Sequence, residues 1–278
     1  MNKANGRALL NASWQLLRKD TELLWLPVLS AAFTTLAALA IFGAGFGLGL
    51  VDPDTDFDSP RVSAIAVVVV VAVVTTVVAV FFQVALAAAA VERADGGDPD
   101  LRSALAAAWA RRMVILKWAV VLATVGLLLR LIQERLGGLA GFLTRLIGEA
   151  AWGVATYFVV PILAVDEVGP VDALRSSGRL MKATWGKVAK TSVPFWGLGL
   201  LLWVPGFFLL TAGLGLLAVA PGPGAAIGVL VASLGALGLV AAGMVVSAVG
   251  TYVRVVLYRH ATGAPIPGIE PSLAARAF

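Results

Sequence analysis

The sequence predicts an all-α fold: a polytopic bundle of six transmembrane helices, with three amphipathic helices at the cytosolic surface of the membrane. Of the 278 residues, 60% are hydrophobic and only 13% are charged, whereas soluble domains carry about 45–50% apolar and about 25% charged residues. Six apolar runs are long enough for a span of about 20 residues. Lysine and arginine gather in alternate connections between these runs. We therefore expect the whole chain, residues 1–278, to fold in lipid as a single membrane domain.

The six apolar runs give the expected spans, and turn residues separate them. The spans are predicted at residues 23–51, 63–91, 113–132, 139–165, 193–220 and 225–257. The sixth run is longer than one span needs, so we expect a helical extension before a short cytosolic tail at 259–278. Asp98-Pro99 predicts an N-cap followed by proline at the first helical position. Gly169-Pro170 predicts a turn and a new helix, and residues 221–224 predict a tight hairpin turn.

The distribution of positive charge predicts the orientation. If both termini are cytosolic, 17 of the 21 lysine and arginine residues lie on the cytosolic side. The others are Arg61, Arg130, Arg135 and Arg145. Because lysine and arginine are retained in cytosolic loops, we expect a multi-pass protein of the cell membrane with both termini in the cytosol. The net charge of +5 then follows from topology, which argues against nucleic acid as a partner.

The predicted cytosolic segments resemble one another. Each begins with an amphipathic helix, reaches a tryptophan and enters a span that carries a second tryptophan near its start. The tryptophans of this pattern are Trp14 and Trp25, Trp109 and Trp118, and Trp185 and Trp196. Indole rings are stable at the membrane–water interface, so we expect interfacial anchors here. The second and third helices also open alike, with Leu101-Arg102-Ser103 and Leu174-Arg175-Ser176. The pattern predicts three repeats, each an interfacial helix plus a transmembrane hairpin.

The third amphipathic helix, residues 171–190, is strongly basic. Steps of three and four residues place one set of side chains on a single stripe: Val171, Leu174, Gly178, Met181, Trp185 and Val188. The cations of the helix are Arg175, Arg179, Lys182, Lys187 and Lys190. These cations are candidate contacts for anionic lipid headgroups. A helix that only anchors the topology is an equally open interpretation.

Four charged residues surround the outer ends of the third and fourth spans. Arg130 and Glu134 are four residues apart, as are Arg145 and Glu149, so each pair shares a helix face. Gly137-Gly138 predicts a bend between the two helices. Glu149 is expected about 15 Å along its helix, where an unpaired carboxylate costs about 2–3 kcal/mol. The cluster predicts a polar lining of a cavity or ion path, a structural ion pair that joins the hairpin, or a slanted helix that brings Glu149 nearer to water.

Glycines recur along the first, fifth and sixth predicted spans. Small residues let membrane helices approach closely, so we expect close helix contacts at these positions: Gly43, Gly45, Gly47, Gly49, Gly197, Gly199, Gly206, Gly213, Gly215, Gly228, Gly235, Gly238 and Gly243.

No pattern of reactive residues points to an enzyme. The chain has no cysteine and one histidine, His260, which alone makes neither a metal site nor a catalytic triad. The acidic residues at 52, 54, 56 and 58 begin like a calcium loop, but Phe57 stands at the turn glycine and Ser63 at the final glutamate. We therefore expect no catalytic, metal-binding or cofactor-binding residues and no cofactor.

Residues 156–186 carry a resemblance to a known family. Pro161 in an apolar segment is followed by Asp166 and Glu167 and then by a helix that contains Ala-Leu-Arg-Ser-Ser, at 173–177, and Trp185. This string resembles a family of bacterial six-span membrane proteins of unknown function. It is more distantly similar to the membrane domain of some glycerophosphodiester phosphodiesterases, whose chemistry takes place in a separate soluble barrel. The resemblance covers residues 7–268 and implies a fold and a compartment, not an activity.

Three functions remain open. The first is a non-catalytic scaffold or lipid-organising module whose partners are membrane lipids, anionic at the cytosolic face, and which acts alone or as a homo-oligomer. The second is a channel or transporter whose path passes Glu149 and Arg145. The third is a membrane subunit of a complex that needs another protein as its partner.

Overall fold

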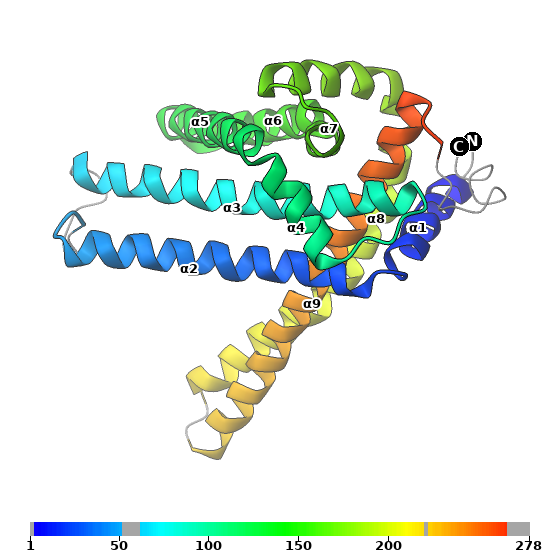
Figure 1. Cartoon of the computed structure of the whole chain (residues 1–278). Helices are drawn as coiled ribbons and strands as arrows, with labels where there is room; N and C mark the ends of the chain where they lie inside the picture. The colour runs from blue at the N-terminus through cyan, green and yellow to red at the C-terminus, as the bar shows by residue number, and fades with distance from the viewer. Residues whose placement is uncertain (1–2, 52–61, 220–221, 266–278) are drawn as a thin grey trace. The chain divides into compact units, whose positions relative to one another are not determined.

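A computed structural model describes residues 3–51, 62–219 and 222–265, and every regular element in this part of the chain is helical (Figure 1). The elements are α1 (Lys3–Leu17), the 3₁₀ helix η1 (Thr21–Leu24), α2 (Trp25–Gly47), α3 (Val62–Ala94), α4 (Leu101–Ala110), α5 (Arg112–Leu136), α6 (Gly138–Thr156), α7 (Val159–Val165), α8 (Pro170–Val219) and α9 (Pro223–Thr262). Six helical segments are long and apolar enough to cross a membrane: Thr21–Gly47, Val62–Ala94, Arg112–Leu136, Gly138–Val165, Gly199–Val219 and Pro223–Thr262. The six predicted apolar runs are thus helices, and the fold is consistent with a multi-pass membrane protein.

The predicted fourth span, 139–165, is not one continuous helix. It is divided into α6 and α7 at Tyr157 and Phe158. Pro161 explains the break, because its ring nitrogen has no hydrogen to donate to the carbonyl oxygen of Tyr157. The backbone N–H of Phe158 instead donates to Ser177 Oγ at 3.1 Å, in a fully buried position. The break between α6 and α7 thus places a buried backbone donor against a side chain of another helix.

The basic helix and the fifth span were predicted as separate elements, at 171–190 and 193–220, but they form one helix. α8 runs for 50 residues, from Pro170 to Val219. It begins at the turn that Gly169-Pro170 predicts. No glycine–proline turn separates the two predicted segments, and the helix continues through Pro194 although this residue has no backbone N–H to donate.

The predicted cap at Asp98 is also wrong by two residues. Asp100 caps α4, where the Ser103 backbone N–H donates to its carboxylate at 2.5 Å, and the Ser103 hydroxyl oxygen accepts the Asp100 N–H at 3.0 Å. This hydrogen bond from the Ser103 backbone holds the pKa of Asp100 below its usual value. Asp98 is engaged elsewhere, since its carboxylate accepts a hydrogen bond from Arg93.

The chain divides into two compact units, and each is described by itself. The first unit contains residues 1–28, 92–98 and 184–278, and the second contains residues 29–91 and 99–183. α8 contributes to both, with its first 14 residues, 170–183, in the second unit.

Two antiparallel pairs organise the second unit. α2 and α3 lie side by side (Figure 1), and Phe33 stacks on Phe82 with ring centroids 5.9 Å apart. α5 and α6 form a hairpin at Gly137-Gly138, both of which have positive φ angles of 58° and 48°. Glycine adopts this conformation without strain, so the bend predicted there is confirmed. Trp118 of α5 stacks on Trp152 of α6.

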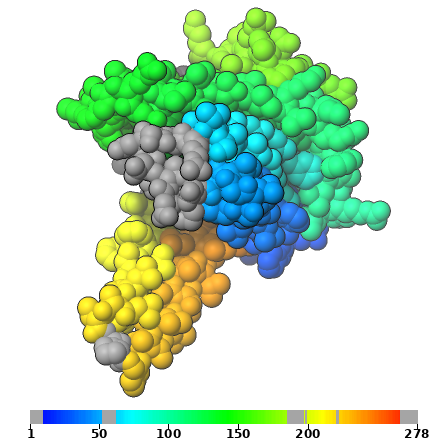
Figure 2. All heavy atoms as spheres, turned by 90° about the vertical axis from the view of Figure 1, so that its left-hand side faces the viewer, coloured from blue at the N-terminus to red at the C-terminus, as the bar shows by residue number. Residues whose placement is uncertain are grey.

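The first unit contains the closest helix contact of the described residues. α1 and η1 pack on α9, and α8 and α9 pack against each other, as Figure 2 shows for the yellow and orange segments. A Cβ atom built on Gly213 would lie 2.2 Å from the Ala232 nitrogen, and one on Gly235 would lie 2.2 Å from the Leu210 nitrogen. The close approach that the glycines predict is therefore confirmed at Gly213 and Gly235. It is not found at Gly43, Gly47, Gly199 or Gly215, where nothing lies within 4 Å of an added Cβ.

We predict that Gly213→Ala destabilises the hairpin of α8 and α9, because the added methyl group forces two backbones apart. Overpacking of this kind costs about 1–3 kcal/mol. Gly215→Ala is the matched control, since nothing lies within 4 Å of a Cβ built there, and replacing a helical glycine gains up to about 1 kcal/mol. The two variants should shift the thermal unfolding midpoint in detergent in opposite directions. Equal midpoints would contradict the close contact.

We also predict that Ser177→Ala destabilises the chain by about 1–3 kcal/mol, because it leaves the buried Phe158 N–H without an acceptor. Ser176→Ala, one residue away and partly exposed, should change the free energy of unfolding by no more than about 0.5 kcal/mol. Thermal unfolding of both variants in the same detergent checks the difference. A Ser177→Ala variant as stable as Ser176→Ala would show that the hydrogen bond contributes nothing.

Candidate functional site

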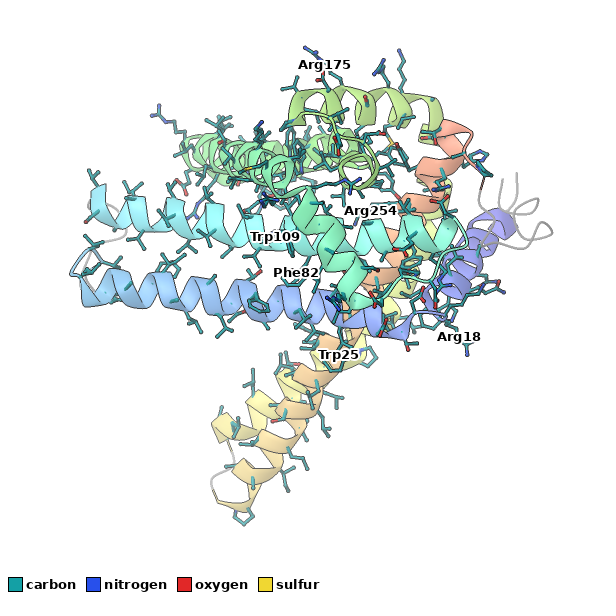
Figure 3. All side chains as sticks on the ribbon, viewed as in Figure 1. Arg18, Trp25, Phe82, Trp109, Arg175 and Arg254 are labelled. Atoms are coloured by element: carbon teal, nitrogen blue, oxygen red, sulfur yellow. The ribbon has the colours of Figure 1, made fainter. Side chains whose placement is uncertain are left out.

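The first part of α8 carries the basic surface that the sequence predicts. Within residues 170–183, one side of the helix is buried at Ala173, Ser177 and Met181. Arg175, Arg179 and Lys182 are exposed, and Figure 3 shows Arg175 projecting outward from the helix. The buried side fixes the helix to the second unit, so its cations are held facing away from the protein interior.

The buried line of this helix differs from the predicted apolar stripe. Met181 belongs to both, but Val171 and Gly178 are exposed, while Ala173 and Ser177 are buried instead. The spacing in the sequence predicts that the larger apolar side chains of the stripe are buried. The structure instead buries the small side chain of Ala173 and that of Ser177, which accepts a hydrogen bond from Phe158. The exposed Val171 is therefore apolar surface next to the basic residues.

A shallow, open hollow lies on the exposed side of α8. It has a volume of about 500 Å³ and is lined by Asp172, Arg175, Ser176 and Arg179. Arg175 Nη1 lies 3.5 Å from Asp172 Oδ1, and Arg179 Nη2 donates to Ser176 Oγ at 3.2 Å. Two guanidinium groups, one hydroxyl and one carboxylate thus meet in one small volume. The two guanidinium groups and the hydroxyl can donate hydrogen bonds to an anion with several oxygen atoms.

The side chains of Trp185, Lys187, Lys190 and Trp196 lie outside the described residues, as does the acidic loop that spans residues 52–58. The predicted roles of these residues stay predictions.

The charged residues of α5 and α6 pair along their own helices. Arg130 Nε donates to Glu134 Oε1 at 2.9 Å, and Arg145 Nε donates to Glu149 Oε1 at 2.9 Å. Every one of these four side chains is more than half exposed in the isolated chain. Each carboxylate is therefore neutralised by an arginine of its own helix, and neither pair joins α5 to α6.

The described tryptophans have two kinds of environment. Trp14, Trp25 and Trp109 are exposed, with Trp25 and Trp109 labelled in Figure 3. Trp109 contacts Phe81 edge to face, and the Arg112 guanidinium lies 5.6 Å from its ring centre. Trp118 is 1% exposed, so its indole packs inside the protein against Trp152. The interfacial role of the exposed three stays a prediction.

His260 lies in the last turn of α9. Among residues 3–51, 62–219 and 222–265, no group of three or more histidine, cysteine, aspartate or glutamate side chains is placed to hold a metal ion.

The structure also brings together a set of charges that sequence reasoning did not connect. Arg93, in the last turn of α3, binds both carboxylate oxygens of Asp20 and also donates to Asp98 Oδ1 at 2.5 Å. Arg259, in the last turn of α9, donates to Asp95 Oδ2 at 2.5 Å and to the Pro265 carbonyl at 2.9 Å. We call Asp20, Arg93, Asp95, Asp98 and Arg259 the polar junction. Its members all belong to the first unit.

The polar junction is largely withdrawn from solvent at its arginines. The side chains of Arg93 and Arg259 are each 11% exposed, and that of Asp20 is 4% exposed. Arg93 and Arg259 lie at the ends of apolar runs. Their positions in the sequence therefore indicate only the orientation of the chain in the membrane. Opposite charges do flank the predicted ends of different spans in the sequence. However, Arg93 and Asp20 are 73 residues apart, so no local pattern shows that these two residues pair.

We predict that Arg93→Gln destabilises the chain by about 3–5 kcal/mol, because it leaves the buried Asp20 carboxylate without its cation. Lys19→Gln is the matched control: it removes an exposed cation next to Asp20 in the sequence and should cost no more than about 0.5 kcal/mol. The thermal unfolding midpoint of each purified variant checks this. A small effect of Arg93→Gln, like that of the control, would contradict a structural role for the polar junction.

Comparison with known proteins identifies a family and adds no activity. A comparison with curated proteins gives no match, and nothing supports the more distant similarity to glycerophosphodiester phosphodiesterases. A family model described as a family of unknown function, DUF6159, matches residues 62–265. That match covers α3 to the end of α9, including Pro161, the hollow on α8 and most of the polar junction. The chain therefore belongs to the family of unknown function DUF6159.

Proposed function

We propose that the chain is a non-catalytic, lipid-organising scaffold of the cell membrane, with both termini in the cytosol and its basic helix at the inner membrane surface. The distribution of 17 of the 21 lysine and arginine residues supports this orientation. The six apolar helices support the compartment. The three predicted repeats and the amphipathic character of their first helices belong to the same proposal.

The single observation that carries the proposal is the outward-facing basic surface of α8. Arg175, Arg179 and Lys182 are exposed on a helix whose opposite side is buried. A basic residue near an anionic membrane surface contributes about 1 kcal/mol of attraction. Three fixed cations on one helix therefore gather anionic lipid more effectively than the same charges on a mobile segment, because the protein has already ordered them.

The pairing on α6 gives the channel or transporter function less support. Glu149 is bound by Arg145 on the same helix, so the acid that was predicted to line a path already has a counter-ion. A membrane subunit of a complex and a homo-oligomer are compatible with the same surface, and no contact of the described residues favours them.

We predict that the reconstituted chain gathers phosphatidylglycerol. In phosphatidylcholine vesicles with a minor fraction of fluorescent phosphatidylglycerol, adding the protein should increase self-quenching. The effect should weaken as salt rises, because the screening length falls from about 10 Å at 0.1 M to about 3 Å at 1 M. The triple variant with Arg175→Gln, Arg179→Gln and Lys182→Gln should remove most of the increase in self-quenching. The double variant with Arg175→Lys and Arg179→Lys, which keeps all three positive charges, should retain it.

Fluorescent phosphatidylcholine in otherwise identical vesicles is the control for lipid and should show no increase. An ion-flux measurement on the same vesicles separates the functions. Unchanged quenching with phosphatidylglycerol, or a flux that Glu149→Gln abolishes, would defeat the scaffold in favour of transport or another role.

A further inference from the structure

We infer that the hollow formed by Asp172, Arg175, Ser176 and Arg179 is a binding site for the phosphate group of a lipid headgroup, and that Asp172 competes with this phosphate for Arg175. The inference rests on the proposed function and names the ligand chemistry of the same surface. The four residues are spaced at i, i+3, i+4 and i+7, so they share one face of α8. They line an open hollow of about 500 Å³, which leaves room for a phosphate and its ester substituents.

The hydrogen-bond arrangement leaves donors for an incoming anion. Arg175 makes a contact of 3.5 Å with Asp172, at the long limit of a hydrogen bond. Ser176 Oγ accepts from Arg179, so the hydroxyl hydrogen of Ser176 is directed away from that guanidinium. Planar guanidinium groups match the spacing of phosphate oxygens and bind them through two parallel hydrogen bonds. A phosphate in the hollow can thus accept from both arginines and from the serine.

The related tripeptide on α4 lacks this arrangement. Leu101-Arg102-Ser103 matches Leu174-Arg175-Ser176, but the Ser103 hydroxyl donates to the Asp100 carbonyl and accepts the Asp100 N–H. Its serine is therefore used by the helix cap. The same sequence pattern supports a cap at α4 and a hollow at α8, so Arg102 provides a matched control for Arg175.

Asp172 provides a second, independent test of the inference. Its carboxylate is exposed and lies in the hollow beside Arg175. A phosphate must displace or repel this carboxylate, so the acid lowers the affinity for anions. Replacing Asp172 with asparagine should therefore tighten binding, whereas a purely structural Asp172 would leave it unchanged.

The surroundings favour a lipid as the source of the phosphate. Val171, next to Asp172, is 58% exposed, and an exposed apolar side chain beside a cationic hollow suits a headgroup that is joined to hydrocarbon. A free phosphate ion gains nothing from that apolar surface.

The test measures the Kd of short-chain phosphatidic acid for the full chain in a neutral detergent, with short-chain phosphatidylglycerol and inorganic phosphate as separate arms. Arg175→Lys with Arg179→Lys keeps the charge but loses the paired hydrogen bonds, and we expect Kd to rise about tenfold, equivalent to about 1.4 kcal/mol. Asp172→Asn should lower Kd severalfold. Arg102→Lys should leave it unchanged.

Three results would overturn the inference. A double lysine variant that binds as tightly as the wild type would show that no built phosphate site is present. An Asp172→Asn variant that binds no more tightly than the wild type would show that the carboxylate does not compete. Inorganic phosphate that binds as tightly as the lipids would exclude a lipid headgroup as the ligand. If the double lysine variant still gathers phosphatidylglycerol in vesicles, the proposed function stands without this site; if the wild type gathers none, the proposed function falls first.

Discussion

The structure depends on the requirement that every backbone donor in an apolar medium finds an acceptor within the protein. A helix meets this requirement by itself, which is why long apolar runs become α2, α3, α5, α8 and α9. The fourth span is divided into two helices, α6 and α7, near Pro161. At this break the N–H of Phe158 donates to Ser177 Oγ at 3.1 Å. This hydrogen bond joins Phe158, just before α7, to the first part of α8, and it accompanies a rotation of α8 about its axis that buries Ser177.

That rotation determines which side chains of α8 meet the solvent or the lipid headgroups. With Ser177 buried, Ala173 and Met181 must be buried as well, since they lie one turn away on either side. Arg175, Ser176 and Arg179 then lie on the exposed side, where they line the hollow with Asp172. The acidic turn, the two adjacent serines and the arginines of this segment therefore form one connected arrangement. Ser177 holds the helix through its hydrogen bond with Phe158. Ser176 lines the hollow, where its hydroxyl hydrogen can contact a ligand.

The sequence was sufficient for the parts of the fold that composition and local turns control. The six apolar helices, the start of α8 at Pro170 and the bend at Gly137-Gly138 follow from short-range patterns. The break at Phe158 was missed although Pro161 is visible, because apolar composition continues through it. The cap at Asp100 was misplaced because two aspartates compete for the role, and only the contact with Arg93 removes Asp98 from it. The pairing of Arg93 with Asp20 depends on tertiary packing, which no local pattern encodes.

The positive charges near the ends of apolar helices have distinct physical roles that a topology count treats alike. Arg93 and Arg259 are nearly buried and bind carboxylates of the first unit, so they are unavailable to lipid. Arg145 is exposed, but it is paired with Glu149 on its own helix. The two opposite charges largely cancel, so the pair attracts a distant anion only weakly. Arg175 and Arg179 are exposed and meet only one carboxylate between them in the hollow. A site for an anion needs cations that are both fixed and incompletely neutralised, and the start of α8 combines exposure, order and excess positive charge around one hollow.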